Sequence, residues 1–137
     1  MQRSWPLVVG AFLSFASIVS ADVPGPVKVS RDGRYFVDKT GAPFFWLGDT
    51  AWPLFAQYSK AQAEAYLENR SKKGFTVIQG VLAWAHGSGM EQKTPMANAL
   101  GHKHWLDDDP SRPNPAYFEH VDHLVDFANR HGLVLAM

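Results

Sequence analysis

The sequence contains no cysteine among its 137 residues, so neither a disulfide nor a thiolate metal site can stabilise it. It has no excess of either charge, because 13 Lys and Arg balance 13 Asp and Glu, and nucleic-acid-binding domains are usually basic. It also lacks a glycine-rich phosphate loop and a Gly-x-Ser-x-Gly nucleophile elbow. What it has is 46% hydrophobic and 13% aromatic residues, a composition that predicts a globular protein held together by burial.

The first 21 residues have the pattern of a secretory signal peptide. Arg3 gives a basic start, residues 7–19 are an apolar segment, and Val19-Ser20-Ala21 is a small-residue cleavage site. A membrane anchor is the alternative, but the apolar segment is short for a span. The sequence therefore predicts cleavage after Ala21, a mature part at residues 22–137, a secreted or periplasmic location, and no membrane association after cleavage.

A small antiparallel meander is expected after the leader. Residues 27–30 alternate as a strand should, and the Asp-Gly pair in 31–34 favours a hairpin turn. Residues 35–37 return as a second strand, and 38–41 turn again into an aromatic strand that begins at Phe44.

Strands and helices then alternate. Ser59 and Gln62 form a capping-box pattern that predicts the start of a helix, and Gly74 is placed to end it. Residues 75–82 are mostly apolar and rich in β-branched side chains, which predicts a strand covered on both sides. Together with the aromatic strand these segments make a βαβ unit, whose two strands should be parallel.

A second helix and a third strand complete the pattern. Asn114 and Pro115 predict a capped helix start, and Gly132 predicts its end. Residues 133–137 begin another buried strand, and no turn or polar tail follows Met137. The expected fold is therefore an α/β fold that is truncated in its third parallel strand.

Polar and aromatic side chains gather where two of these strands should end. Asp49 closes the aromatic strand and Trp52 follows it, while Gln79 interrupts an apolar strand that leads to Trp84 and His86. The carboxyl ends of parallel strands are where α/β enzymes place their sites. Structural roles are the alternatives, with Asp49 capping a turn and the aromatic residues filling the core or packing within the loop. We expect these five residues to form a substrate-facing wall.

Histidines and a run of acidic residues are weaker indications of a metal site. His102 and His104 lie in a long loop, and His120 and His123 are expected on the solvent side of their helix without a third ligand. Residues 107–109 are acidic but lack the ligand spacing of a calcium loop. We therefore predict no metal site and no cofactor.

Several stretches together resemble the apiosidase-like family of glycoside hydrolases. They are residues 33–35, 41–52, 73–79 and 108–118, and the most specific are the run from Trp46 to Trp52 and the Asn-Pro-x-Tyr-Phe start of the last helix. The resemblance implies a (β/α)8 TIM barrel that acts on plant cell-wall polysaccharide, notably pectic side chains. It also implies two catalytic carboxylates on later strands, typically the fourth and the seventh, so the acid/base pair is expected beyond Met137.

The sequence as a whole predicts the amino-terminal fragment of an exported glycoside hydrolase barrel, preceded by the meander and inactive alone. In the complete enzyme one carboxylic acid would protonate the glycosidic oxygen while the other attacks the anomeric carbon or activates water. Its partner would be a polysaccharide or oligosaccharide, with no nucleic acid, and no oligomeric state is predicted. The alternatives are a non-catalytic carbohydrate-binding or adhesion module on the same scaffold and a metal hydrolase that uses the histidines.

Overall fold

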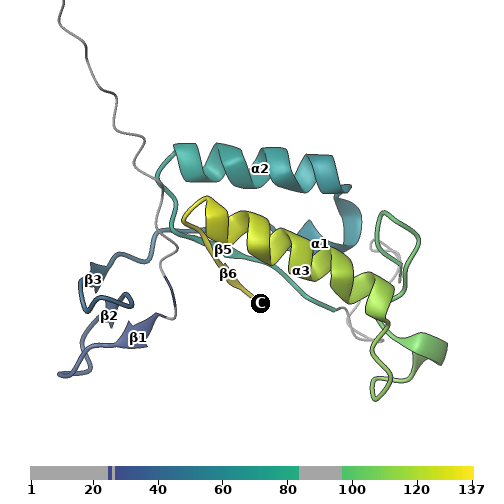
Figure 1. Cartoon of the computed structure of the whole chain (residues 1–137), viewed down its shortest axis with the longest axis horizontal. Coiled ribbons are helices and arrows are strands. Elements are labelled where there is room, and N and C mark those ends of the chain that lie inside the picture. Colours follow the sequence, from purple (N-terminus) through teal and green to yellow (C-terminus); the bar gives the residue numbers. More distant parts are fainter. Residues whose placement is uncertain (1–24, 26, 84–96) are drawn as a thin grey trace, which may run out of the picture.

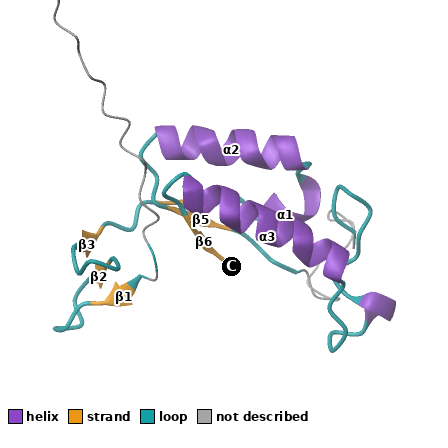
Figure 2. Ribbon diagram, in the orientation of Figure 1, coloured by secondary structure: helices purple, strands orange, loops and turns teal. Residues whose placement is uncertain are grey.

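The computed structural model describes residues 25, 27–83 and 97–137. The expected leader and the expected site residues Trp84 and His86 lie outside these ranges. None of the helices in these ranges combines the length and the hydropathy that a membrane span requires. The described residues form two three-stranded sheets and the helices that cover one of them (Figures 1 and 2).

The first sheet is the expected antiparallel meander. Its strands are β1 (Lys28–Val29), β2 (Phe36–Val37) and β3 (Pro43–Phe44), in the order β1-β2-β3. The hairpin between β1 and β2 contains Gly33 at a φ of 73°, a conformation that glycine adopts without strain. The prediction of a meander is confirmed, with strands shorter than expected.

The second sheet is parallel and contains β4 (Gly48–Thr50), β5 (Val77–Gln79) and β6 (Val134–Ala136). The strands lie in chain order, β4-β5-β6. The helices α2 (Lys60–Lys72) and α3 (Pro115–Arg130) connect them and lie side by side over one face of the sheet (Figure 1). The predicted βαβ arrangement with parallel strands is confirmed.

Both long helices begin where their caps predict. The Ser59 hydroxyl accepts a hydrogen bond from the backbone N–H of Gln62, whose side chain accepts one from the Ser59 N–H. At α3 the Asn114 side chain accepts from the backbone N–H of Ala116. The sequence did not predict the short helix α1 (Leu54–Gln57) or the 3-10 turn η1 (Leu106–Asp108).

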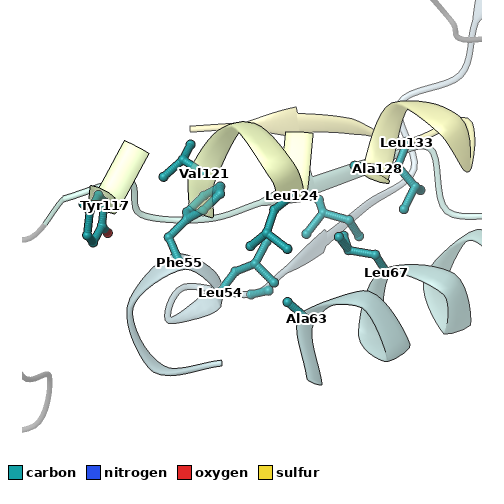
Figure 3. Packing of buried hydrophobic residues seen from close by; sticks show 11 residues of the cluster. Leu54, Phe55, Ala63, Leu67, Tyr117, Val121, Leu124, Ala128 and Leu133 are labelled. Carbon is teal, nitrogen blue, oxygen red and sulfur yellow. The ribbon is translucent and has the colours of Figure 1, made fainter. Parts of the chain in front are cut away.

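The core lies between the parallel sheet and the helices. Leu54 and Phe55 of α1, Leu67 of α2 and Leu124 of α3 are fully buried and point toward one another (Figure 3). Ile78 of β5 belongs to the same cluster. Burial of such side chains contributes about 1.5–3 kcal/mol each, so this layer is what holds the strands in register.

The aromatic run that was expected to be one strand is divided between the two sheets. Phe44 pairs with Phe36 in the meander, whereas pairing with β5 starts only at Gly48. Between them the Thr76 hydroxyl accepts from the N–H of Leu47 and donates to the carbonyl of Phe45. The chain therefore passes from one sheet to the other within residues 45–47. For this reason the alternation of side chains between the two faces of a strand does not extend from Phe45 to Asp49.

Candidate functional site

The two faces of the parallel sheet have different surroundings. Asp49 is in register with Ile78, which is buried under the helices, so Asp49 also points to the helix side. Thr50, Gln79 and Ala136 are in register with one another and occupy the opposite face. The expectation that Asp49 and Gln79 share one wall is wrong, because they project from opposite sides of the sheet.

The carboxylate of Asp49 is held by α2. The Tyr66 hydroxyl donates a hydrogen bond to it over 2.8 Å, and Arg70 Nε lies 2.6 Å from the same oxygen. The Arg70 guanidinium also lies over the Tyr66 ring, at 4.8 Å, and near the Phe75 ring, at 5.7 Å. The hydrogen bonds from Tyr66 and from the Thr50 N–H, with the charge of Arg70, hold the pKa of Asp49 below its usual value. Asp49 is thus an ionised anchor between β4 and α2.

A hollow of about 570 Å³ lies at the carboxyl ends of β5 and β6. The exposed Gln79 lines it, together with Val81, Leu82, Ala136 and Met137. Its remaining wall includes Trp105, which comes from the long loop before α3. The sequence predicted a site at this edge of the sheet.

Trp105 is the residue of this hollow that the sequence reasoning did not single out. Its backbone forms an isolated bridge with Pro113, and its ring is 5.9 Å from the Phe118 ring and 5.2 Å from that of His104. These neighbours fix a half-buried indole at the hollow. The signal that could have found it is a Trp in the long loop before α3.

Trp52 lies at the same edge without lining the hollow. Its carbonyl accepts a hydrogen bond from the Val81 N–H, which extends the β4–β5 ladder beyond the strands. Half of its surface is exposed. Gly80, between Gln79 and Val81, is closely packed, because a Cβ there would lie 3.2 Å from the Phe55 ring and 3.3 Å from the Ala51 carbonyl.

Helix α3 supports the hollow through Tyr117. This buried side chain donates a hydrogen bond of 2.7 Å to the carbonyl of Leu82. Burial raises the pKa of Tyr117 to about 12, so its hydroxyl remains a donor across the physiological range. The contact joins the first turn of α3 to the rim of the hollow.

The histidines differ from the expectation in one respect. His120 is only 4% exposed, so the prediction that it lies on the solvent side of α3 is wrong; His123 is partly exposed and lies 2.6 Å from Glu64. Leu100 and His102 of the loop before α3 line the same pocket as His120, on a side of the helix that the apolar stripe of the sequence predicted to face solvent. Within the described ranges, no group of three or more His, Asp or Glu side chains could hold a metal ion.

Acidic side chains are scarce on the described strands. Asp49 is the only one, and it faces the helices. Residues 107–109 form a surface turn in which Lys103 pairs with Asp108 and the carboxylate of Asp109 accepts hydrogen bonds from Ser111. The described part of the chain thus presents an uncharged hollow rather than a pair of opposed carboxylates.

Comparisons with known proteins show what the chain is similar to. The family described as "Apiosidase-like, catalytic domain" matches residues 30–137. A solved structure described as "Glycoside hydrolase" is 30% identical with a TM-score of 0.68, and the match covers 83% of this chain and 25% of that one. A family 5 glycoside hydrolase from Bacteroides vulgatus ATCC 8482 is 26% identical with a TM-score of 0.66, covering 83% and 24%. The chain therefore spans about a quarter of the length of these two proteins, and no curated protein matches it.

Proposed function

Because the chain belongs to the apiosidase-like glycoside hydrolase family, we propose that it forms one wall of the substrate cleft in a barrel that hydrolyses glycosidic bonds of pectic polysaccharide. The single observation that carries this proposal is the hollow lined by Gln79 and Trp105 at the carboxyl ends of β5 and β6. That edge is where barrels of alternating strands and helices place their active sites.

The strand order and the positions of the helices fit a segment of a barrel. A (β/α)8 barrel adds strands in chain order and keeps every connecting helix on its outer face. Each half of a doubly wound sheet also keeps chain order and places its helices on one face, so the choice of the barrel rests on the family and on the glycoside hydrolase relatives. Here β4, β5 and β6 lie in chain order, and α2 and α3 cover the same face (Figure 2). The face with Thr50 and Gln79 would then be the barrel interior.

The chemistry of the hollow suits a neutral sugar ring. An indole offers a flat apolar surface to the C–H face of a sugar, and the Gln79 amide can both donate to and accept from hydroxyl groups. Trp52, at the same edge, is a further platform for a longer glycan. The structural relatives are described as glycoside hydrolases, which favours hydrolysis over simple binding.

The catalytic carboxylates come from strands other than β4, β5 and β6 in this proposal. Hydrolysis needs two carboxyl groups on either side of the scissile bond, roughly 5–10 Å apart. Asp49 cannot be one of a pair in the barrel interior, since its carboxylate is bound to Tyr66 and Arg70 on the outer face. The 137-residue chain alone should be inactive, and the mature protein exported after cleavage at Ala21.

Variants of the complete enzyme test the proposal. Trp105→Ala and Gln79→Ala should each lower kcat/KM on pectic oligosaccharides by about tenfold or more, the loss expected from a stacking platform or a buried hydrogen bond. Gln57→Ala is the matched amide control, because Gln57 is exposed on α1 and does not line the hollow. The measurement is release of sugars by chromatography.

Two outcomes separate the rival functions. Unchanged kcat/KM in both hollow variants would show that the hollow is not part of the cleft. Glycan binding without any released sugar by the complete protein would instead support a non-catalytic carbohydrate-binding module.

A further inference from the structure

A second pocket, of about 260 Å³, lies beside the amino-terminal turns of α2 and α3. Lys60, the first residue of α2, lines one side, and His102 reaches it from the loop before α3. The first turns of α3 contribute Glu119, His120 and His123. This pocket is separate from the hollow, and no residue lines both.

His120 has an unusual position in this pocket. It is only 4% exposed, and neither of its ring nitrogens has a hydrogen-bond partner among the described residues. Most buried polar groups are paired, and one left unpaired has a desolvation penalty comparable to a lost hydrogen bond. Two unpaired nitrogens on one buried ring therefore point to a ligand that supplies their partners.

The charges around His120 indicate the sign of that ligand. Burial lowers the pKa of His120 first, and the positive charges of His123, Lys60 and His102 lower it further. Amino-terminal helix turns add partial positive charge and unpaired N–H groups. Two carboxylates lie nearby: Glu64 is engaged by His123, and Glu119 is exposed on the rim.

The arrangement does not suit a metal. Three protein ligands are the usual minimum for a stable transition-metal site. The described residues contain no such group of His, Asp and Glu. A ligand that accepts hydrogen bonds from several separate donors fits the lining better.

We propose that this pocket binds a small oxyanion, a phosphate or carboxylate group, held by Lys60, His102 and His120. An anion here would accept a hydrogen bond from the His120 ring and offset the positive charges that converge on it. It would also favour the protonated ring, so binding should be accompanied by proton uptake. Affinity should therefore rise as the pH falls toward the pKa of His120, which lies below its usual value because the ring is buried and Lys60 and the neighbouring histidines surround it.

The His120 ring itself is the best reporter. In the full 137-residue chain, the ¹⁵N chemical shifts of His120 are followed by NMR while inorganic phosphate or acetate is added at constant ionic strength with NaCl. We expect a saturable movement of the ring shifts toward the imidazolium value, and the preferred anion distinguishes phosphate from carboxylate chemistry. The apparent affinity for acetate, whose charge does not change in this range, should be greater at pH 6 than at pH 7.5.

Matched variants make the test specific. Lys60→Met should weaken the binding about tenfold, as expected for the loss of a charge-assisted hydrogen bond. Lys72→Met removes the same charge from the far end of α2, where Lys72 pairs with Glu68, and should leave the binding unchanged. His120→Gln removes the reporter ring, so its binding is followed by the ring shifts of His102, which lines the same pocket, and should be abolished. If this variant fails to fold, the comparison of Lys60→Met with Lys72→Met still tests the proposal.

The proposal is overturned if neither anion changes the His120 shifts beyond an NaCl control, because the pocket then holds only solvent. Equal weakening by Lys60→Met and Lys72→Met would also overturn it, since the effect would then be one of net charge. Neither result bears on the glycosidase proposal, which rests on the hollow.

Discussion

Removal of the Tyr66 hydroxyl tests the assignment of Asp49 as an anchor rather than a ligand for sugar. Tyr66→Phe deletes the 2.8 Å hydrogen bond to the Asp49 carboxylate and leaves the ring in place over Arg70. A hydrogen bond to a charged group contributes about 1.5–3 kcal/mol when it is buried. The Asp49 side chain keeps 30% of its surface exposed, so water screens part of this, and we expect a loss of about 1–2 kcal/mol.

The pH dependence of this loss is specific to Asp49. Its pKa is lowered in the folded state, chiefly by the Tyr66 hydrogen bond, so the unfolded chain binds the proton more readily. The stabilisation is therefore fully present above about pH 4, the ordinary range of an Asp carboxyl, and is lost as the pH falls through the lowered value. The difference between wild type and Tyr66→Phe should shrink in that window.

Urea unfolding of the full chain, followed by circular dichroism at pH 7 and at pH 3, measures both effects. Tyr35→Phe is the matched control, because Tyr35 is half exposed in the meander. In a double-mutant cycle with Asp49→Asn, the two changes should be less than additive. The anchor role of Asp49 is refuted if Asp49→Asn leaves the free energy of unfolding unchanged at pH 7 while it weakens sugar binding by the complete enzyme.

Three further predictions follow from the core, the rim of the hollow and the leader. Leu124→Ala removes a fully buried side chain between α3 and the sheet and should lower the free energy of unfolding by about 2–5 kcal/mol, measured by urea titration, whereas an equal effect from the exposed Leu100→Ala would contradict this. Tyr117→Phe should cost about 1 kcal/mol and lower activity of the complete enzyme because the Leu82 carbonyl loses its donor; stability loss without an effect on activity would show that the contact does not shape the hollow. Amino-terminal sequencing of secreted protein should begin at Asp22, and an intact Met1 would count against export.

The sequence predicted the features that depend on neighbouring residues. Ser59 with Gln62 and Asn114 with Pro115 mark helix starts because capping satisfies backbone N–H groups within one turn. The parallel pairing of β4, β5 and β6 follows from the short helical connections between them. These are local rules, and the structure confirms them.

The sequence could not predict which side chains face one another across strands. Alternation within a strand fixes Gln79 relative to Ile78, but the register between strands decides whether Asp49 lies beside Ile78 or beside Gln79. A shift of one residue in this register moves every side chain of the strand to the other face. The face of Asp49 also cannot be inferred by alternation from Phe44 or Phe45, because the chain passes from one sheet to the other within residues 45–47. The burial of His120 and the position of Trp105 depend in the same way on the packing of a distant loop.

The register also explains why this edge of the sheet is polar but uncharged. Since Asp49 faces the helices, the described strands place only Thr50, Gln79 and Ala136 at the end of the open face. A hydroxyl, an amide and a methyl group, with the indole of Trp105 beside them, can orient a sugar ring but cannot transfer a proton at neutral pH. In the proposed barrel, a carboxylate added to this face would point into the cleft and raise the pKa of any carboxyl group close to it. In the proposed barrel, Asp49 would thus point outward, and its structural charge would stay outside the cleft. Sugar binding and proton transfer would then belong to different strands.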